Sequence, residues 1–343
     1  MSNAPAAEAL AQVLEDSRWL PHQLNAEGQL VLVETSRQKL ASLPFVDGRE
    51  PFATGSGLIV QLADALAAKW QRPPGPDRMI FHMAFCGSTL LATLLDQPGK
   101  TFVLREPNLL ADLANMAHPA SRDEALRALP IVCDLLRRRW SKNERTVVKP
   151  SNWVNPLLPQ LTDPGQDVRS IFITIEPHEY LMAVFRGGRP RLEFVVRSAF
   201  HFLEGRRDRN ELLAEAIAPA DPLARAARFA LLAHKLQADL FREAIKQRGW
   251  TDECRLSFAM IDHDPLASAI KAAKLLGLTN QAGEIEQAWF RIKGRNVKQN
   301  SAGWSPDERS RIDREVEAEH GRRFREALIW YEQQLETLDV LAA

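Results

Sequence analysis

Residues 78–95 read Arg78-Met-Ile-Phe-His-Met-Ala-Phe-Cys-Gly-Ser-Thr-Leu-Leu-Ala-Thr-Leu-Leu95. An apolar run enters a corner of small residues at Cys86-Gly87-Ser88-Thr89 and continues with leucines at helical spacing. A short apolar run that ends in a glycine turn is typical of a buried strand, and the pattern after it is typical of a helix. The segment therefore predicts a strand, a tight turn and a helix.

The turn at Gly87 has the features of an anion-binding corner. Glycine permits a tight turn and a close approach of the backbone to a ligand. The N–H groups at the start of the next helix can bind an anion, and the helix dipole favours negative charge there. Ser88 and Thr89 add hydroxyl donors. The alternative is a turn and helix cap without a ligand, which many α/β domains contain.

The turn does not match the nucleoside-triphosphate signature G-x-x-x-x-G-K-[ST], because no lysine follows Gly87 and no earlier glycine is in register. It resembles instead the phosphosulfate-binding loop of the sulfotransferase superfamily, in which a strand runs into a Gly-Ser/Thr-Thr turn and a leucine-rich helix. Phe85 stands where that family commonly has a lysine or arginine, so the cation is expected from elsewhere. The resemblance implies that the loop binds the donor nucleotide through Cys86, Gly87, Ser88, Thr89 and Leu90.

Composition and charge restrict the class of protein. The chain has 343 residues, 45% hydrophobic and 26% charged, which is enough for one large α/β domain. Lys+Arg and Asp+Glu both number 44, so the charge balance does not favour nucleic acid or a membrane surface as a partner. The three cysteines lack metal or redox spacing, and the N-terminus lacks a basic and apolar leader. We expect a cytoplasmic protein with no metal site.

Strands and helices are expected to alternate from residue 79 to residue 176. The apolar pattern predicts strands at 79–84, 101–105, 146–149 and 168–176, with helices at 87–96 and 123–140. Strand–helix–strand order predicts a parallel sheet. Outside this region we expect helices at 6–14, 58–70, 224–246 and 307–341 and strands at 30–34 and 255–261.

Charged residues follow two of the expected strands. Ligands of open parallel sheets lie outside the carboxyl ends of the strands, and Glu106 and Lys149 stand at two such ends. The sequence Val-Val-Lys149-Pro-Ser looks like a Lys-Thr-Pro segment of several sulfotransferases, and many members have a histidine or glutamate at the place of Glu106. The resemblance implies that Glu106 is the general base and that Lys149 contacts the transferring group. The alternatives are an Arg105–Glu106 ion pair and a surface lysine.

The family also carries an arginine and a serine that hold the 3′-phosphate of the nucleotide. In Ile173-Thr-Ile-Glu-Pro-His-Glu-Tyr-Leu-Met-Ala183, these places are taken by Ile175 and Ala183. Guanidinium groups suit phosphate, and three arginines follow this segment on a glycine turn. The 3′-phosphate is therefore expected on Arg186, Arg189 and Arg191, and the alternative is a solvated basic loop.

A last basic segment, Phe290-Arg-Ile-Lys-Gly-Arg295, is followed by Gly303-Trp304. It resembles the Arg-Lys-Gly…Gly-Asp-Trp loop that closes over the nucleotide in cytosolic sulfotransferases, although its spacing is longer. The resemblance implies that Lys293 and Arg295 reinforce the anion site. The alternative is a loop between helices whose charges face water.

These observations predict an α/β protein with a three-layer P-loop NTPase-like parallel sheet flanked by helices and a largely helical C-terminal half. We expect an N-terminal segment at 1–76, a sulfotransferase-like domain at 77–305 and a C-terminal helix at 306–343. The expected activity is sulfuryl transfer from 3′-phosphoadenosine-5′-phosphosulfate to a hydroxyl or amine of an unknown small-molecule or carbohydrate acceptor. A divergent P-loop kinase and a noncatalytic anion-binding protein are the alternatives, and the oligomeric state is open.

Overall fold

The computed structural model describes residues 7–116, 122–204, 206, 209–280, 282–293, 295–296, 301–302 and 306–342. Its centre is a five-stranded sheet with the strand order β5-β6-β4-β7-β8, in which all neighbouring strands are parallel. The strands are β4 (Asp77–His82), β5 (Thr101–Arg105), β6 (Arg145–Lys149), β7 (Val168–Thr174) and β8 (Arg255–Ser257). The predicted α/β class with a parallel sheet is confirmed.

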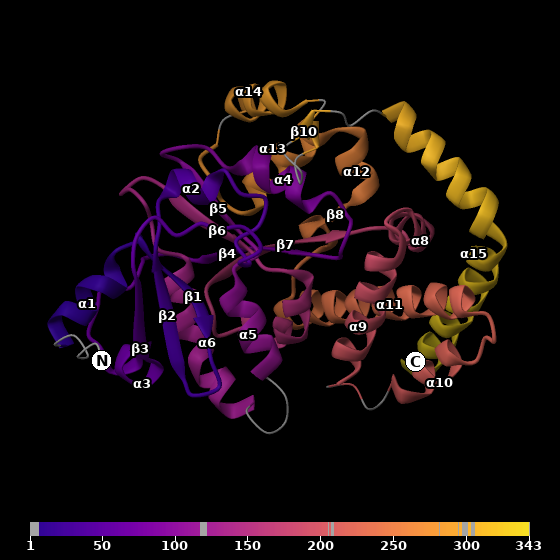
Figure 1. Cartoon of the computed structure of the whole chain (residues 1–343), viewed down its shortest axis with the longest axis horizontal. Coiled ribbons are helices and arrows are strands. Elements are labelled where there is room, and N and C mark those ends of the chain that lie inside the picture. Colours follow the sequence, from indigo (N-terminus) through magenta and orange to yellow (C-terminus); the bar gives the residue numbers. More distant parts are fainter. Residues whose placement is uncertain are drawn as a thin grey trace.

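Helices cover both faces of this sheet (Figure 1). The helices α4 (Ser88–Leu95), α13 (Pro265–Leu275) and α14 (Ala282–Ile292) pack on one another on one face. The other face is covered by elements that pack on one another and on β4, namely α5 (Asn108–Met116), α6 (Arg122–Leu136), the 3₁₀ helix η1 (Asn152–Leu157), α7 (Leu158–Leu161) and α11 (Pro222–Arg248).

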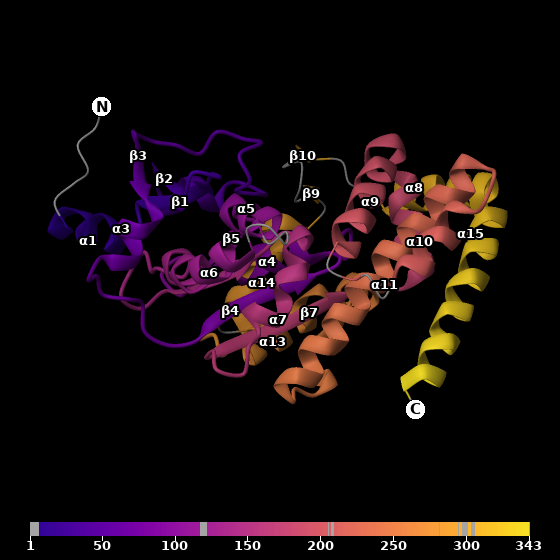
Figure 2. The same cartoon turned by 90° about the horizontal axis from the view of Figure 1, so that it is seen from below.

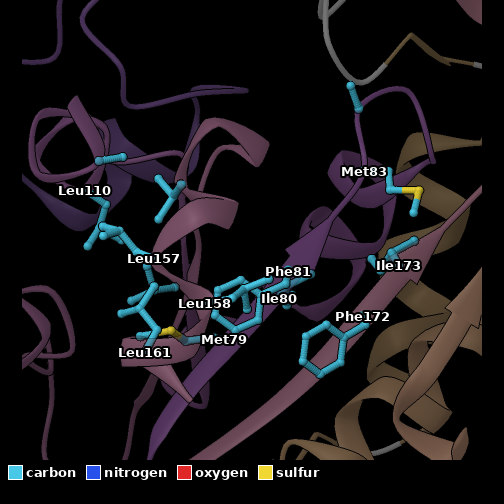
Figure 3. Packing of buried hydrophobic residues seen from close by; sticks show 14 of the residues in the cluster. Met79, Ile80, Phe81, Met83, Leu110, Leu157, Leu158, Leu161, Phe172 and Ile173 are labelled. Atoms are coloured by element: carbon cyan, nitrogen blue, oxygen red, sulfur yellow. The ribbon is translucent and has the colours of Figure 1, made fainter. Parts of the chain in front are cut away.

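Strands β4 and β7 run through the middle of the core, and most of their residues are buried. The rings of Phe81 and Phe172 stack with their centroids 5.6 Å apart. Figure 3 shows Met79 and Phe81 beside the leucines of η1 and α7. Burial of one such aromatic side chain contributes roughly 1.5–3 kcal/mol to folding.

The N-terminal segment, for which the sequence predicts both helical and extended stretches, forms a small antiparallel sheet with three helices. Its strands are β1 (Trp19–Leu24), β2 (Gln29–Glu34) and β3 (Gly57–Gln61), and its helices are α1 (Ala7–Glu15), α2 (Arg37–Ala41) and α3 (Leu62–Ala67). The prediction of a helix over 58–70 is thus wrong for its first residues. Residues 57–61 pair with β2, with Leu30 opposite Val60, and this pairing overrides the local helical pattern.

Helix α6 ends at Leu136, before the basic residues that were expected in its last turn. Arg138 instead ties the N-terminal segment to the core, because its Nη1 donates to the carbonyl oxygens of Leu14 and Asp16, each at 2.8 Å. Burial lowers the pKa of Arg138 to about 10. Figure 2 shows the N-terminal sheet at one end of the molecule and the helical half at the other.

The C-terminal half is helical, as the sequence predicts. It contains α8 (Pro177–Arg186), α9 (Gly188–Leu203), α10 (Asn210–Ile217), the 3₁₀ helix η3 (Asp252–Cys254), α12 (Phe258–His263) and α15 (Pro306–Ala342), with the two-stranded pair β9 (Arg295–Asn296) and β10 (Ser301–Ala302). Helix α15 runs along the outer edge of this half and packs on α8 and α11 (Figure 1).

The expected strand over 255–261 is shorter than predicted. The hydroxyl of Ser257 accepts the N–H of Met260 at 3.2 Å, and this cap begins α12 directly after β8. One cluster of buried apolar side chains takes in residues from Leu10 to Tyr331. The division of the chain at residues 76 and 305 stays a prediction.

Candidate functional site

The order of the strands places a crevice beside β4. From β4 the chain goes first to β5 and β6 on one side, and only then to β7 on the other side. In open α/β sheets, ligands bind outside the carboxyl ends of the strands at such a reversal. The predicted loop at Gly87 follows β4 and therefore lies at this point.

The loop turns into α4 through Gly87, which has a φ of 79° and serves as the N-cap residue of that helix. A Cβ atom at this position would lie 3.2 Å from Ile261 Cγ2, so only glycine fits both the backbone and the space. The first N–H groups of a helix lack intrahelical partners and point toward the crevice end. The remaining predicted loop residues are placed around this turn, with Cys86, Ser88 and Thr89 buried and Leu90 half-buried.

Two residues at this edge that are not glycine have left-handed backbones. Phe85 has a φ of 66° and Glu106 a φ of 54°. This conformation costs about 1–2 kcal/mol per residue for an L-amino acid with a side chain. Such strain is retained where the surrounding structure holds a side chain in a required direction, and it clusters at functional sites. Among the described residues, these are the positions other than glycine with positive φ.

Glu106 lies in a group of charged and polar side chains at the ends of three strands. Lys149 Nζ is 2.6 Å from Glu106 Oε1, and His82 Nε2 is 3.8 Å from the same oxygen. Lys149 is fully buried, while the Glu106 side chain is 14% exposed. The structure thus brings the two predicted catalytic residues together and adds the buried ring of His82, which is not among the predicted site residues.

The alternative of an Arg105–Glu106 ion pair is wrong. Arg105 Nη2 binds Asp96 Oδ2 at 3.0 Å, and its Nη1 donates to the carbonyl oxygen of Leu43 at 2.8 Å. Successive residues of a strand point to opposite faces of the sheet. Arg105 therefore points toward α2 and α4, and Glu106 faces the strand ends. The alternative of a surface lysine at 149 is also wrong, because that side chain is buried.

A loop from the N-terminal segment covers the Glu106 side of the edge. The N–H of Val46 donates to the carbonyl oxygen of Arg105 at 2.7 Å. Phe45 brings its ring centroid to 5.9 Å from Lys149 Nζ, and the guanidinium of Arg49 lies 4.4 Å from the same ring. The hydrogen bond that Arg49 donates to Asp47, and to a smaller extent the charge of Glu106, raise the pKa of Arg49. No motif in the sequence marks Phe45 or Arg49, because only the fold brings residues 45–49 to this edge.

On the other side of the Gly87 loop lies a pocket of about 430 Å³. Its wall combines Phe85 and Gly87 with residues from the ends of β7 and β8 and from α8, α9 and α15. Ile175 and Ala183 line it, and so do Arg186 and Arg191. The structure therefore places two of the three predicted arginines in one pocket with the loop glycine.

Arg191 is held over the loop by three features. Its guanidinium carbon lies 4.7 Å from the Phe85 ring centroid, a cation–π contact. Its Nη1 donates to the carbonyl oxygen of Ala183 at 2.5 Å. A Cβ atom on Gly187 would lie 1.9 Å from Arg191 Cδ, so the glycine permits this path of the side chain. Burial, and to a smaller extent the charge of Arg186, lower the pKa of Arg191.

Helix α15 supplies charges that sequence reasoning missed. Asp313 Oδ1 accepts a hydrogen bond from Arg186 Nε at 2.6 Å and forms an ion pair with Arg186 Nη2 at 2.5 Å. Arg309 lines the same pocket, binds Asp262 Oδ1 at 2.9 Å and lies 5.3 Å from the Phe258 ring centroid. The amphipathic pattern of residues 307–341 indicates a helix but does not show which part of the fold it contacts.

The other predicted anion-binding residues do not join this pocket. Arg189 is 89% exposed, pairs with Glu193 at 2.6 Å and is not part of the pocket wall, and it lies in α9 and not in a loop. Lys293 is exposed at the end of α14 and is not part of the pocket wall. The side chain of Arg295, and Gly303-Trp304, lie outside the described residues.

Two further searches of the described part of the chain were negative. It contains no group of three or more His, Cys, Asp and Glu side chains arranged to hold a metal ion. No described helix has the length and apolar character that crossing a membrane requires.

The chain has a distant structural similarity to a protein of known structure. No family model matches the sequence, and no curated protein matches it. The crystal structure of a sulfotransferase from Alicyclobacillus acidocaldarius superposes with a TM-score of 0.36 and 14% sequence identity, over 77% of this chain and 97% of that chain.

Proposed function

We propose that this protein is a sulfotransferase-type enzyme that moves a sulfuryl group from 3′-phosphoadenosine-5′-phosphosulfate to a hydroxyl or amine. The observation that carries the proposal is the order of groups along the sheet edge. Arg186 and Arg191 lie on one side of the Gly87 loop, and Glu106 with Lys149 lies beyond β4 on the other. A nucleotide bound across the loop would have its 3′-phosphate among the arginines and its sulfuryl group near Glu106.

Sulfuryl transfer at this site requires no reactant other than the donor and the acceptor. The acceptor oxygen or nitrogen forms a bond to sulfur, and the bond from sulfur to the 5′-phosphate oxygen breaks. The leaving group is adenosine 3′,5′-bisphosphate, and the proton of the acceptor passes to Glu106. The N–H groups of the loop and the hydroxyls of Ser88 and Thr89 are placed to stabilise the charge that develops on the leaving oxygen.

Lys149 receives a different role from the one that the resemblance implies. Its buried ammonium is bound to Glu106 Oε1 at 2.6 Å, so we assign it to hold Glu106 in position and not to contact the sulfuryl group. Arg191, stacked on Phe85, is the cation that lies over the loop. We therefore propose that it supplies the charge that the loop itself lacks.

A second candidate is a noncatalytic protein that binds an anionic nucleotide. The same buried Lys149–Glu106 pair favours it, because a buried and fully engaged ion pair can have a purely structural role. Binding of the nucleotide is common to both candidates, so only turnover separates them.

The first test is thermal stabilisation of the full chain by adenosine 3′,5′-bisphosphate, beside ATP with magnesium, adenosine 5′-phosphosulfate and sulfate. A ligand at about 100 times its dissociation constant adds about 2.7 kcal/mol to the free energy of unfolding. We expect the strongest response to the bisphosphate, and Arg189→Ala should respond as the wild type does. A response to ATP alone would contradict the proposal and favour a kinase.

The second test uses donor labelled in its sulfuryl group with a panel of alcohols, phenols, sugars and amines. Label transfer that is lost in Glu106→Gln while bisphosphate binding is retained would support the enzyme. Binding of the bisphosphate with no transfer to any acceptor and no donor hydrolysis would favour the noncatalytic candidate.

A further inference from the structure

The carboxylate of Asp313 lies inside the arginine pocket. Nε of Arg186 donates to its Oδ1 at 2.6 Å, Nη2 of Arg186 lies 2.5 Å from the same oxygen in an ion pair, and Arg309 Nε lies 3.7 Å from its Oδ2. The side chains of Arg186 and Asp313 are 23% and 29% exposed. The pair is therefore shielded on most sides but open to the pocket.

Asp313 occupies the donors that a phosphate would use. A guanidinium group binds carboxylate and phosphate through the same fork of N–H groups. Arg186 cannot present the Nε–Nη2 edge of its guanidinium group to a ligand phosphate while Asp313 Oδ1 occupies that edge. A phosphate that binds Arg186 in the same manner has to displace the carboxylate.

We propose that Asp313 sets the affinity of this pocket, as an internal carboxylate that competes with the 3′-phosphate of the nucleotide for Arg186. The inference rests on the proposed function, because it takes the 3′-phosphate as the ligand group of the pocket. A nucleotide without that phosphate leaves the Asp313–Arg186 pair intact. Asp313 therefore weakens binding of the bisphosphate and leaves binding of the monophosphate unchanged.

If Asp313 releases Arg186, its carboxylate still has a positively charged neighbour. Arg309, one turn earlier on α15, lies close enough to become its main partner. Arg309 is also bound to Asp262 at 2.9 Å, which holds the start of α15 to α12. Farther along α15, the hydroxyl of Tyr331 lies 2.9 Å from His234 Nδ1. The exchange of partners therefore requires a rotation of one side chain and not release of the helix.

The competition has a consequence for turnover. Donor and product both carry the 3′-phosphate, so Asp313 weakens the binding of both by a similar factor. Binding that is equal for substrate and product does not accelerate the chemical step, while slow product release limits many enzymes. Asp313 thus raises the rate at which adenosine 3′,5′-bisphosphate leaves.

The test is calorimetric titration of the wild type, Asp313→Asn, Asp313→Glu and the control Glu317→Gln with adenosine 3′,5′-bisphosphate and with adenosine 5′-monophosphate. Glu317 lies one turn farther along α15 and is not part of the pocket wall; its partner at 3.2 Å is His178, which lines the pocket, and not Arg186. We expect Asp313→Asn to bind the bisphosphate about 10-fold more tightly, equivalent to about 1.4 kcal/mol, with unchanged affinity for the monophosphate. Asp313→Glu, which keeps a carboxylate, and Glu317→Gln should stay near the wild type.

The inference is overturned if the wild type binds the bisphosphate and Asp313→Asn binds it with equal or lower affinity. The proposed function would then stay intact, since Asp313 would orient Arg186. If no variant binds the bisphosphate, inorganic pyrophosphate separates the two ideas. Tighter pyrophosphate binding by Asp313→Asn would retain the competition and refute the assigned nucleotide. No binding of either anion by any variant would refute both.

Discussion

Lys149 and Glu106 are joined twice at the ends of two neighbouring strands. The ammonium nitrogen of Lys149 lies 2.6 Å from Glu106 Oε1, and the backbone N–H of Glu106 donates to the Lys149 carbonyl oxygen, also at 2.6 Å. The second bond continues the β5–β6 ladder by one residue, in which Arg105 pairs with Lys149. The position of the carboxylate is thus fixed by both backbone and side chain.

This pair predicts that Lys149→Ala lowers stability as well as turnover. Removal of one partner of a buried ion pair leaves the other charge uncompensated and costs about 3–5 kcal/mol. A catalytic role alone would leave the melting temperature nearly unchanged, so urea denaturation beside the label-transfer assay checks the prediction. In the double variant Lys149→Met with Glu106→Leu, stability should recover while turnover stays absent. Recovery of turnover in that variant would exclude Glu106 as the base.

The second prediction concerns the loop glycine. Gly87→Ala is expected to lose about 1–2 kcal/mol from the left-handed backbone, and more because its Cβ atom would lie 3.2 Å from Ile261 Cγ2. Gly99→Ala is a matched control, since Gly99 has a φ of 77° and no atom within 4 Å of its Cβ position. Urea denaturation should show the larger loss for Gly87→Ala, and bisphosphate binding should fall only in that variant. Equal losses of stability would mean that Ile261 moves aside.

The third prediction separates the three arginines of residues 186–191. Arg186→Ala and Arg191→Ala should each weaken bisphosphate binding roughly 10- to 100-fold, because a hydrogen bond to a charged group contributes about 1.5–3 kcal/mol. Arg189→Ala carries the same charge change but removes a solvent-exposed side chain, so its affinity should equal that of the wild type. Similar losses in all three would mean that binding depends on net charge and not on the pocket.

The fourth prediction concerns acid stability and His234. Nε2 of its buried ring donates to the carbonyl oxygen of Ile175 at 2.7 Å, and burial lowers the pKa of His234 to about 4. Because the folded-state pKa lies below the unfolded value of 6.5, the stabilisation is complete above pH 6.5 and is lost as the pH falls toward 4. The loss amounts to about 3 kcal/mol.

His234→Gln keeps a hydrogen-bonding side chain but does not titrate. Its free energy of unfolding should be lower than that of the wild type at pH 8 and should fall less between pH 6.5 and pH 4. Urea denaturation of both proteins across this range isolates the contribution of His234, because the other titrating groups are shared. Parallel curves would show that His234 has the same pKa in the folded and unfolded states, which would contradict the prediction.

The central part of the fold could be predicted from the sequence because its signals are local. The apolar run before Gly87 and the runs at 101–105 and 146–149 bury both faces of their strands, and this leaves a continuous pattern in the chain. The strand at 57–61 could not be predicted from a local pattern. Its pairing with β2 depends on residues that lie about thirty positions earlier, and the local pattern there is equally compatible with a helix.

The residues of the candidate site also divide into those that local sequence patterns predict and those that only tertiary packing brings to the site. The resemblance and the strand ends identified Glu106, Lys149 and the loop, since each follows an apolar strand directly. Asp313 and Arg309 could not be found, because helix α15 reaches the pocket only through tertiary packing. Arg189 was selected with Arg186 and Arg191 because the three share a segment, but Arg189 points to solvent from the first turn of α9. Position in the sequence does not reveal the direction of a side chain.

The left-handed backbones of Phe85 and Glu106 set a limit on engineering this protein for heat resistance. Glycine at either position would relieve about 1–2 kcal/mol of backbone strain, but this gain is smaller than the loss at Glu106, because an unpaired buried Lys149 costs about 3–5 kcal/mol. Phe85→Gly removes the ring beneath Arg191 and Glu106→Gly removes the carboxylate beside Lys149. Stabilised variants should therefore be sought elsewhere in the chain, and a library selected for thermal stability should retain Glu106 despite its left-handed backbone.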